Sequence, residues 1–274
     1  MSSLLRVPSG QADLAVLTAG DGAPVLFLHA AICDHRMWRE QVAAVGDAGY
    51  RAIAYDRRGH GTTSAIAQAH SPVADAMAVL DALAPGQSAV LVGCSQGGRI
   101  ALDAALRHPA RVRGLVLVDN SVSGAPDPVH PPAIQALGDA VAAARAAGDI
   151  DRVNALLARV WLDGVLASEG RVAGPARELF LDMNGRILRA APVGESVDTQ
   201  TAYDRLGQIG VPTHVIVGDL DYPHIQERCR HVAATVPGAT LQVVHGAAHL
   251  PSLEQPGAVT RGILELLARA RQAG

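Results

Sequence analysis

Lysine is absent from this chain of 274 residues, so all 23 basic residues are arginines. With 26 acidic residues, the formal net charge is −3. A protein with this balance presents no strongly basic surface for DNA, RNA or an anionic membrane. We therefore expect neither nucleic acid nor a membrane among its partners.

Cysteine and long apolar runs are also scarce. The three cysteines, Cys33, Cys94 and Cys229, are widely spaced and form no C-x-x-C pair, which argues against a disulfide framework and a structural zinc site. Residues 1–10 contain no basic stretch leading into an apolar segment, and no run approaches the ~20 apolar residues of a membrane span. We expect a cytoplasmic protein.

Apolar residues make up 49% of the chain, which is enough to bury the core of one domain. Segments with strand character alternate with segments of helical periodicity. This alternation is typical of βαβ units, which build a mostly parallel sheet covered by helices on both faces. The expected strands are residues 25–29, 51–55, 88–92, 112–118, 213–218 and 240–244, and the expected helices are residues 37–45, 72–84, 96–107, 224–236 and 256–271.

Residues 120–203 interrupt the alternation. This segment is rich in alanine and arginine with helical spacing, contains several prolines and offers no convincing strand. We predict a helical cap over residues 120–203, inserted into an α/β core that residues 1–119 and 204–274 form together.

A serine flanked by glycines, in the stretch GCSQG from Gly93 to Gly97, lies where an expected strand gives way to an expected helix. A serine on so tight a turn takes a strained backbone conformation, and the glycines leave room for it. The turn would hold the Ser95 hydroxyl out at the carboxyl end of the sheet, with the Gln96 N–H facing the same space. The alternative is an ordinary glycine-rich turn in which Ser95 caps the helix.

Partners for such a serine follow later in the chain. A serine hydroxyl is a poor nucleophile unless an imidazole takes its proton, and that imidazole needs a carboxylate to fix its tautomer. His249 lies in the loop between the last strand and the last helix, and Asp219 and Asp221 follow the preceding strand. The order Ser, Asp, His matches one known order of a catalytic triad. Asp119, at the end of strand 112–118, is a third candidate for the acid.

Five motifs carry chemistry or tight turns: HAA at residues 29–31, DRRGHG at 56–61, GCSQGG at 93–98, VGDLD at 217–221 and AHLPSLEQP at 248–256. In this order they resemble motifs of the α/β-hydrolase superfamily, over nearly the whole chain. The resemblance implies a mostly parallel, doubly wound α/β-hydrolase sheet with a helical cap inserted after the sixth family strand. It also implies Ser95 as nucleophile, His249 as base and, from the Gly-x-x-Asp spacing, Asp221 rather than Asp219 as the orienting acid.

The same resemblance assigns the oxyanion hole to the backbone N–H groups of Ala31 and Gln96. Ala30 replaces the glycine that customarily follows the histidine of this loop. We expect Ala30 to restrict the backbone conformations open to this loop, which carries the Ala31 N–H donor. Loss of one oxyanion donor would cost about 3–4 kcal/mol of transition-state stabilisation.

Two neighbouring residues receive structural interpretations. His245 ends its strand, and we expect it to be partly buried. Its spacing from His249 is that of two metal ligands on a helix, but the glycine and alanines between them favour a loop, so we predict no metal site. Cys94 is expected to turn away from Ser95 into the core.

The substrate pocket should lie between the cap and the sheet. Aromatic residues make up only 3% of the chain, so we expect a small, aliphatic pocket. Each candidate residue has core packing as its alternative role. The candidates are Trp38, Trp161, Leu166, Phe180, Met183, Tyr222 and Leu250.

Serine at the turn narrows the chemistry that the resemblance implies. Dehalogenases and epoxide hydrolases of this fold use an aspartate there, because attack at an sp³ carbon needs a carboxylate, whereas serine suits an acyl carbon. We therefore predict a serine-dependent hydrolase of small to medium carboxylic esters or lactones, acting through an acyl-enzyme without a cofactor. The alternatives are a perhydrolase, a C–C or other acyl hydrolase, and a small-molecule receptor with slow turnover. The sequence leaves the oligomeric state open.

Overall fold

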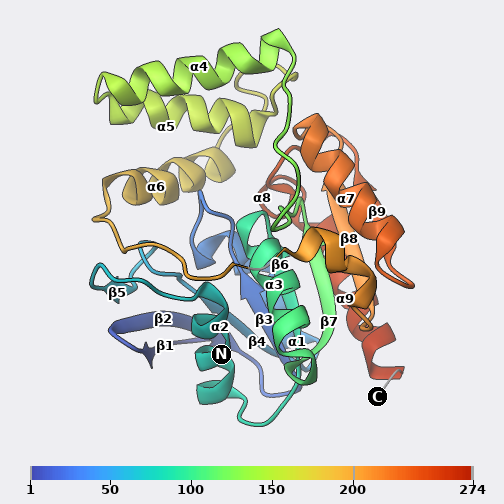
Figure 1. Cartoon of the computed structure of the whole chain (residues 1–274). Helices are drawn as coiled ribbons and strands as arrows, with labels where there is room; N and C mark the ends of the chain where they lie inside the picture. Colours follow the sequence, from blue (N-terminus) through green and yellow to red (C-terminus); the bar gives the residue numbers. More distant parts are fainter. Residues whose placement is uncertain (1, 200, 273–274) are drawn as a thin grey trace.

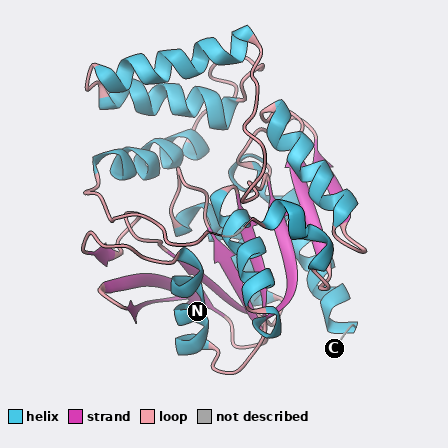
Figure 2. Ribbon diagram, in the orientation of Figure 1, coloured by secondary structure: helices cyan, strands magenta, loops and turns pink. Residues whose placement is uncertain are grey.

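One twisted sheet runs through the molecule, with helices on both of its faces (Figure 1, Figure 2). The computed structural model describes residues 2–199 and 201–272. The strand order is β1-β2-β4-β3-β6-β7-β8-β9, with β5 beside β2. The strands are β1 Ser2–Ser9, β2 Ala12–Ala19, β3 Pro24–Leu28, β4 Arg51–Tyr55, β5 Ser64–Ala65, β6 Ala89–Cys94, β7 Val112–Val118, β8 Thr213–Gly218 and β9 Thr240–Val244.

The strands from β4 to β9 along the sheet pair in parallel, whereas β1, β2 and β5 pair antiparallel at one edge. The predicted mostly parallel sheet is therefore confirmed. The β1–β2 hairpin was not predicted, because β1 is an edge strand with exposed Leu4 and Leu5 and lacks a clear apolar pattern.

Within the described residues, six helices of the core cover the two faces of the sheet. The helices of the core are α1 Arg39–Asp47, α2 Pro72–Leu83, α3 Gln96–Arg107, α7 Pro223–Thr235, α8 Pro251–Glu254 and α9 Pro256–Gln272. Four of these six begin on a proline, whose fixed φ and missing N–H suit the first helical position.

The core consists of two apolar layers, one on each face of the sheet. Along β3, Leu26 and Leu28 belong to the layer that packs against α2, α3 and α7, while Val25 and Phe27 belong to the layer that packs against α1 and α9. All five residues of β3 are buried. Burial on both faces is what a central parallel strand requires.

Three helices lie between β7 and β8 in the chain: α4 Pro132–Ala146, α5 Ile150–Ala158 and α6 Pro175–Arg189. Figure 1 shows them stacked together beyond one end of the sheet. A π-helical turn, Arg159–Asp163, follows α5 and carries Trp161. No described helix is long and apolar enough to cross a membrane.

The chain that returns from α6 is fastened to the start of α2. Asp198 accepts hydrogen bonds from Ser71 Oγ (2.6 Å) and Val73 N (3.0 Å), and it also pairs with Arg107 of α3. His70 and Ser196 form a parallel bridge beside it. These contacts hold the segment that follows the cap helices against the core at α2 and α3.

Helix α3 starts in close contact with β3 and β6. A Cβ on Gly97 would lie 2.1 Å from Leu28 O, and one on Gly93 would lie 2.4 Å from Gly97 O. Both obstacles are backbone atoms, so only glycine allows the strand-to-helix turn to be this tight.

We predict that Gly97→Ala lowers the free energy of unfolding by about 1–3 kcal/mol or more, because the added methyl group overlaps the β3 backbone. Gly138→Ala is the matched control, since an added Cβ at this exposed α4 position meets no described atom within 4 Å. The control should raise stability by up to about 1 kcal/mol, the helix preference of alanine over glycine. Denaturant midpoints measure both changes, and a Gly97→Ala protein as stable as the wild type would contradict the packing account.

Candidate active site

Ser95 sits at the turn between β6 and α3 with φ 53° and ψ −117°. Such a conformation costs a non-glycine residue about 1–3 kcal/mol, and the surroundings must hold it in place. Ser95 N donates to Val118 O (3.0 Å), and Ser95 O accepts from Ser121 N (3.2 Å) and Ser121 Oγ (3.1 Å). The Ser95 side chain makes no capping hydrogen bond to α3, so the alternative of a simple helix cap is not supported.

His249 and Asp221 form a buried pair. His249 Nδ1 lies 2.7 Å from Asp221 Oδ2, and the two side chains are 2% and 1% exposed. Asp221 Oδ1 accepts from Tyr222 N (2.7 Å). Because a carboxylate only accepts, Nδ1 carries the proton of the neutral imidazole, and Nε2 is left as the acceptor that a triad needs.

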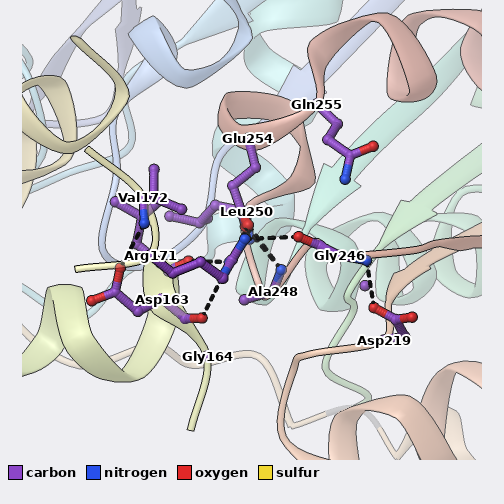
Figure 3. A network of polar contacts seen from close by, with 12 residues as sticks. Asp163, Gly164, Arg171, Val172, Asp219, Gly246, Ala248, Leu250, Glu254 and Gln255 are labelled. Atoms are coloured by element: carbon purple, nitrogen blue, oxygen red, sulfur yellow. Dashed lines mark hydrogen bonds and ion pairs between the residues drawn. The ribbon is translucent and has the colours of Figure 1, made fainter. Parts of the chain in front are cut away.

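Asp219 instead braces the loop that carries His249. Its carboxylate accepts from Gly246 N (2.7 Å), a contact drawn in Figure 3, and from His245 Nδ1 (2.8 Å). The prediction that His245 is partly buried is wrong, since its side chain is 85% exposed. His245 lies just beyond β9, where the chain has already left the sheet.

Glu254 of α8 holds the backbone on both sides of His249. Its carboxylate accepts from Ala248 N (3.0 Å) and Leu250 N (3.3 Å). Burial raises the pKa of Glu254, while the charge of Arg171 opposes that effect. Arg171, from the segment between α5 and α6, pairs with Glu254 and donates to Gly246 O (2.7 Å), so it clamps the cap onto the histidine loop (Figure 3).

The predicted oxyanion loop follows β3. Ala30 has no positive φ, so the alanine needs no backbone geometry reserved for glycine. Arg57 N donates to His29 Nε2 (3.0 Å), and burial together with the Arg57 charge lowers the pKa of His29 well below its usual value. Neither Ala31 N–H nor Gln96 N–H donates to any described residue. The oxyanion role of these two N–H groups stays a prediction.

Arg57 was not singled out from the sequence, yet it joins the two predicted halves of the oxyanion hole. Its side chain is buried and donates to Gln96 Oε1 (2.7 Å) and His29 O (3.2 Å). The sequence signal was its place inside the DRRGHG motif, which does not show where the side chain turns.

The predicted pocket residues occupy different places in the structure. The Trp161 ring of the cap lies 4.5 Å from the His249 ring and 5.0 Å from the ring of Tyr222, which comes from the core between β8 and α7. Leu250 is buried next to His249, while Leu166 is 71% exposed. Trp38, Phe180 and Met183 are fully buried in one apolar cluster, which fits their alternative role in core packing, and their pocket role stays a prediction.

Two histidines near this group were missed. The His130 and His224 rings lie 5.0 Å apart, and each is within 5.3 Å of the Tyr222 ring. Burial and the charge of Arg228 lower the pKa of His224 to about 4, so it is neutral at physiological pH. These residues come from the loop before α4 and from α7, and no sequence motif connects them.

The sequence pattern of the alpha/beta hydrolase family matches residues 25–261. The chain belongs to this family. The resemblance seen in its five motifs is thereby confirmed, as is the fold class.

Known relatives of this hydrolase carry varied activities. Non-heme chloroperoxidase CPO-A1 of Kitasatospora aureofaciens is 28% identical over 256 residues, which cover 84% of this chain and 86% of that protein. A thermophilic esterase from Thermogutta terrifontis, whose structure is known, has 27% sequence identity to this chain. The two structures superpose with a TM-score of 0.74 over 98% of this chain and 99% of the esterase chain. The structure of Est816, described as an N-acyl homoserine lactone degrading enzyme, is 26% identical with a TM-score of 0.74, covering 95% and 99%.

We predict that Arg171→Ala lowers the free energy of unfolding by about 1–3 kcal/mol, because it leaves the 2% exposed Glu254 carboxylate without its cation. Arg186→Ala is the control, since Arg186 and Asp182 form an exposed pair on α6 that is worth less than about 0.5 kcal/mol. Denaturant midpoints compare the two variants. Equal midpoints for both would mean that Arg171 does not hold the cap on the histidine loop.

Proposed function

We propose that the protein is a serine-dependent hydrolase of small to medium carboxylic esters or lactones. The observation that carries the proposal is the buried hydrogen bond from His249 Nδ1 to Asp221, together with the strained turn that presents Ser95. A fixed imidazole tautomer with a free Nε2 is what a serine hydroxyl needs as its base.

In the first half of this reaction, His249 Nε2 takes the proton of Ser95 Oγ as that oxygen attacks the substrate carbonyl carbon. The negative charge on the carbonyl oxygen is met by the N–H groups of Ala31 and Gln96. His249 then gives the proton to the leaving alcohol oxygen, and the substrate acyl group remains as an ester of Ser95.

In the second half, water attacks the acyl carbon and His249 takes a proton from it. The same donors stabilise the second tetrahedral oxyanion. Collapse breaks the bond to Ser95 Oγ, which regains its proton from His249. Asp221 stays ionised throughout and stabilises the imidazolium that forms in each half.

Relatives with esterase and lactone-degrading activity support this substrate class. A small acyl group is favoured because Trp161 and Tyr222 already lie close to the base. The scheme needs no cofactor or metal, since nucleophile, base and oxyanion donors are all protein groups.

The similarity to a chloroperoxidase favours one second candidate, a perhydrolase. Here hydrogen peroxide replaces water in the second half and releases a peracid from Ser95. The same acyl-enzyme serves both reactions, so the ratio of peracid to acid formed in peroxide distinguishes them.

We expect the wild-type protein to hydrolyse chromogenic esters in a series from acetate to long acyl chains, with the highest kcat/KM for short chains. Ser95→Ala should lower kcat by about 10⁴ to 10⁶ because the acyl-enzyme can no longer form. Steady-state rates with both proteins test this, with denaturant midpoints as the check on folding. Undiminished hydrolysis by the folded variant would exclude Ser95 as nucleophile, whereas a covalent wild-type adduct without turnover would favour a slow receptor.

The acid is tested by a matched pair of variants. Asp221→Asn should lower kcat by up to about 10⁴, because the amide favours the wrong imidazole tautomer. Asp219→Asn should change kcat only a few-fold, since an amide oxygen still accepts from Gly246 N and the lost partner, His245, is exposed. The reverse order of effects would assign the acid role to Asp219.

A further inference from the structure

Asp119, the residue directly after β7, is held in an unusual conformation. Among residues 2–199 and 201–272, only Ser95 and Asp119 are non-glycine residues with positive φ, 53° and 42°. Asp119 is fully buried. Backbone strain at a buried residue persists only where the surrounding structure enforces it.

Its contacts connect it to the turn that carries Asp221. Asp119 N donates to Ile216 O (2.9 Å) of β8, and Asp119 Oδ1 accepts from Gly218 N (3.0 Å). Asp119, Asp221 and His249 each bring a side-chain nitrogen or oxygen within 4.8 Å of the others. Asp119 Oδ2 is buried, and no described donor reaches it.

Two buried carboxylates this close to each other cannot both be ionised at low cost. Within the described part of the chain, the Asp221 carboxylate has two donors, Tyr222 N and His249 Nδ1, whereas the Asp119 carboxylate has one, Gly218 N. The better-solvated anion is therefore Asp221.

The other groups around Asp119 do not change this result. Burial, and after it the charge of Asp221, raises the pKa of Asp119 well above its usual value, and the carboxylate of Glu254 acts in the same direction. His249 also faces it, as do the thiols of Cys94 and Cys229. Burial raises the pKa values of both thiols, so both are neutral.

We propose that Asp119 is a positioning residue whose protonated Oδ2 donates a hydrogen bond to the Asp221 carboxylate. This bond satisfies the otherwise unpartnered oxygen and gives Asp221 a third donor. It fixes the plane of the Asp221 carboxylate so that Oδ2 faces His249 Nδ1. The positioning role of Asp119 rests on the proposed function. The protonation of Asp119 is independent of that function.

Two substitutions separate the proton from the side-chain volume. Asp119→Asn is the conservative variant, because its amide N–H₂ can donate to Asp221 while its oxygen still accepts from Gly218 N. Asp119→Ala removes both the donor and the acceptor. A role limited to packing would make asparagine and alanine differ only in stability.

The kinetic test compares ester hydrolysis by the wild type and both variants over the pH range that contains the acid limb of the pH–rate profile. We expect Asp119→Asn to keep kcat within about threefold and to leave the acid limb of the pH–rate profile in place, whereas Asp119→Ala loses at least about tenfold in kcat with little change in KM. Ionised Asp119 would give another result. Its replacement by asparagine would remove a negative charge beside His249 and move the acid limb to lower pH, which would overturn the proposal. Equal kcat and equal profiles for asparagine and alanine would also overturn it.

The second test needs no substrate. Folded Asp119 keeps a proton that an unfolded aspartate releases above about pH 4, so the free energy of unfolding of the wild type should fall, relative to that of Asp119→Asn, as pH rises from 4 to 7. The denaturant midpoint of Asp119→Asn minus that of the wild type should therefore increase as pH rises across this range. A midpoint difference that does not change with pH would show that Asp119 is ionised. A positive result here with no ester turnover by the wild type would reject the proposed function and keep the protonated pair.

Discussion

The candidate site depends on the hydrogen bond between His249 Nδ1 and Asp221 Oδ2, which are 2.7 Å apart. Both side chains are almost fully buried, and neighbouring groups hold them in this position. Glu254 holds the backbone on both sides of His249, and Tyr222 N fixes the other oxygen of Asp221. A hydrogen bond between a buried base and a buried acid fixes which ring nitrogen carries the proton. The direction of proton transfer from Ser95 depends on that choice.

The sheet brings these groups together because parallel strands end at one edge. Ser95 follows β6, Asp119 follows β7, Asp221 follows β8 and His249 follows β9, and these four strands are neighbours in this order. The two strained residues, Ser95 and Asp119, both lie at this edge. Backbone strain is thus concentrated at the sheet edge where the candidate site residues follow their strands, and the closely packed sheet and helices hold it in place.

Much of the fold was predictable because parallel strands and their helices leave strong local patterns. The parallel strands β3, β4, β6, β7, β8 and β9 and the Ser95 turn each carry a short motif or an apolar run, whereas the two-residue strand β5 was not predicted. The β1–β2 hairpin left no such signal, since β1 is an exposed edge strand. Asp119, Arg57 and Arg171 act through contacts with residues distant in the chain, and single-sequence spacing does not encode such contacts. The exposure of His245 was mispredicted for a related reason, because strand ends are poorly fixed by local pattern.

The central claim is that Ser95 is an activated nucleophile, and a fluorophosphonate probe tests it most directly, since the probe reacts with an activated serine whatever the natural substrate. Intact mass and peptide mapping of the labelled protein give the number and position of adducts. We expect one adduct per chain, located on Ser95, which forms only while the protein is folded. A folded protein that stays unlabelled, or that is labelled at another residue, would contradict it.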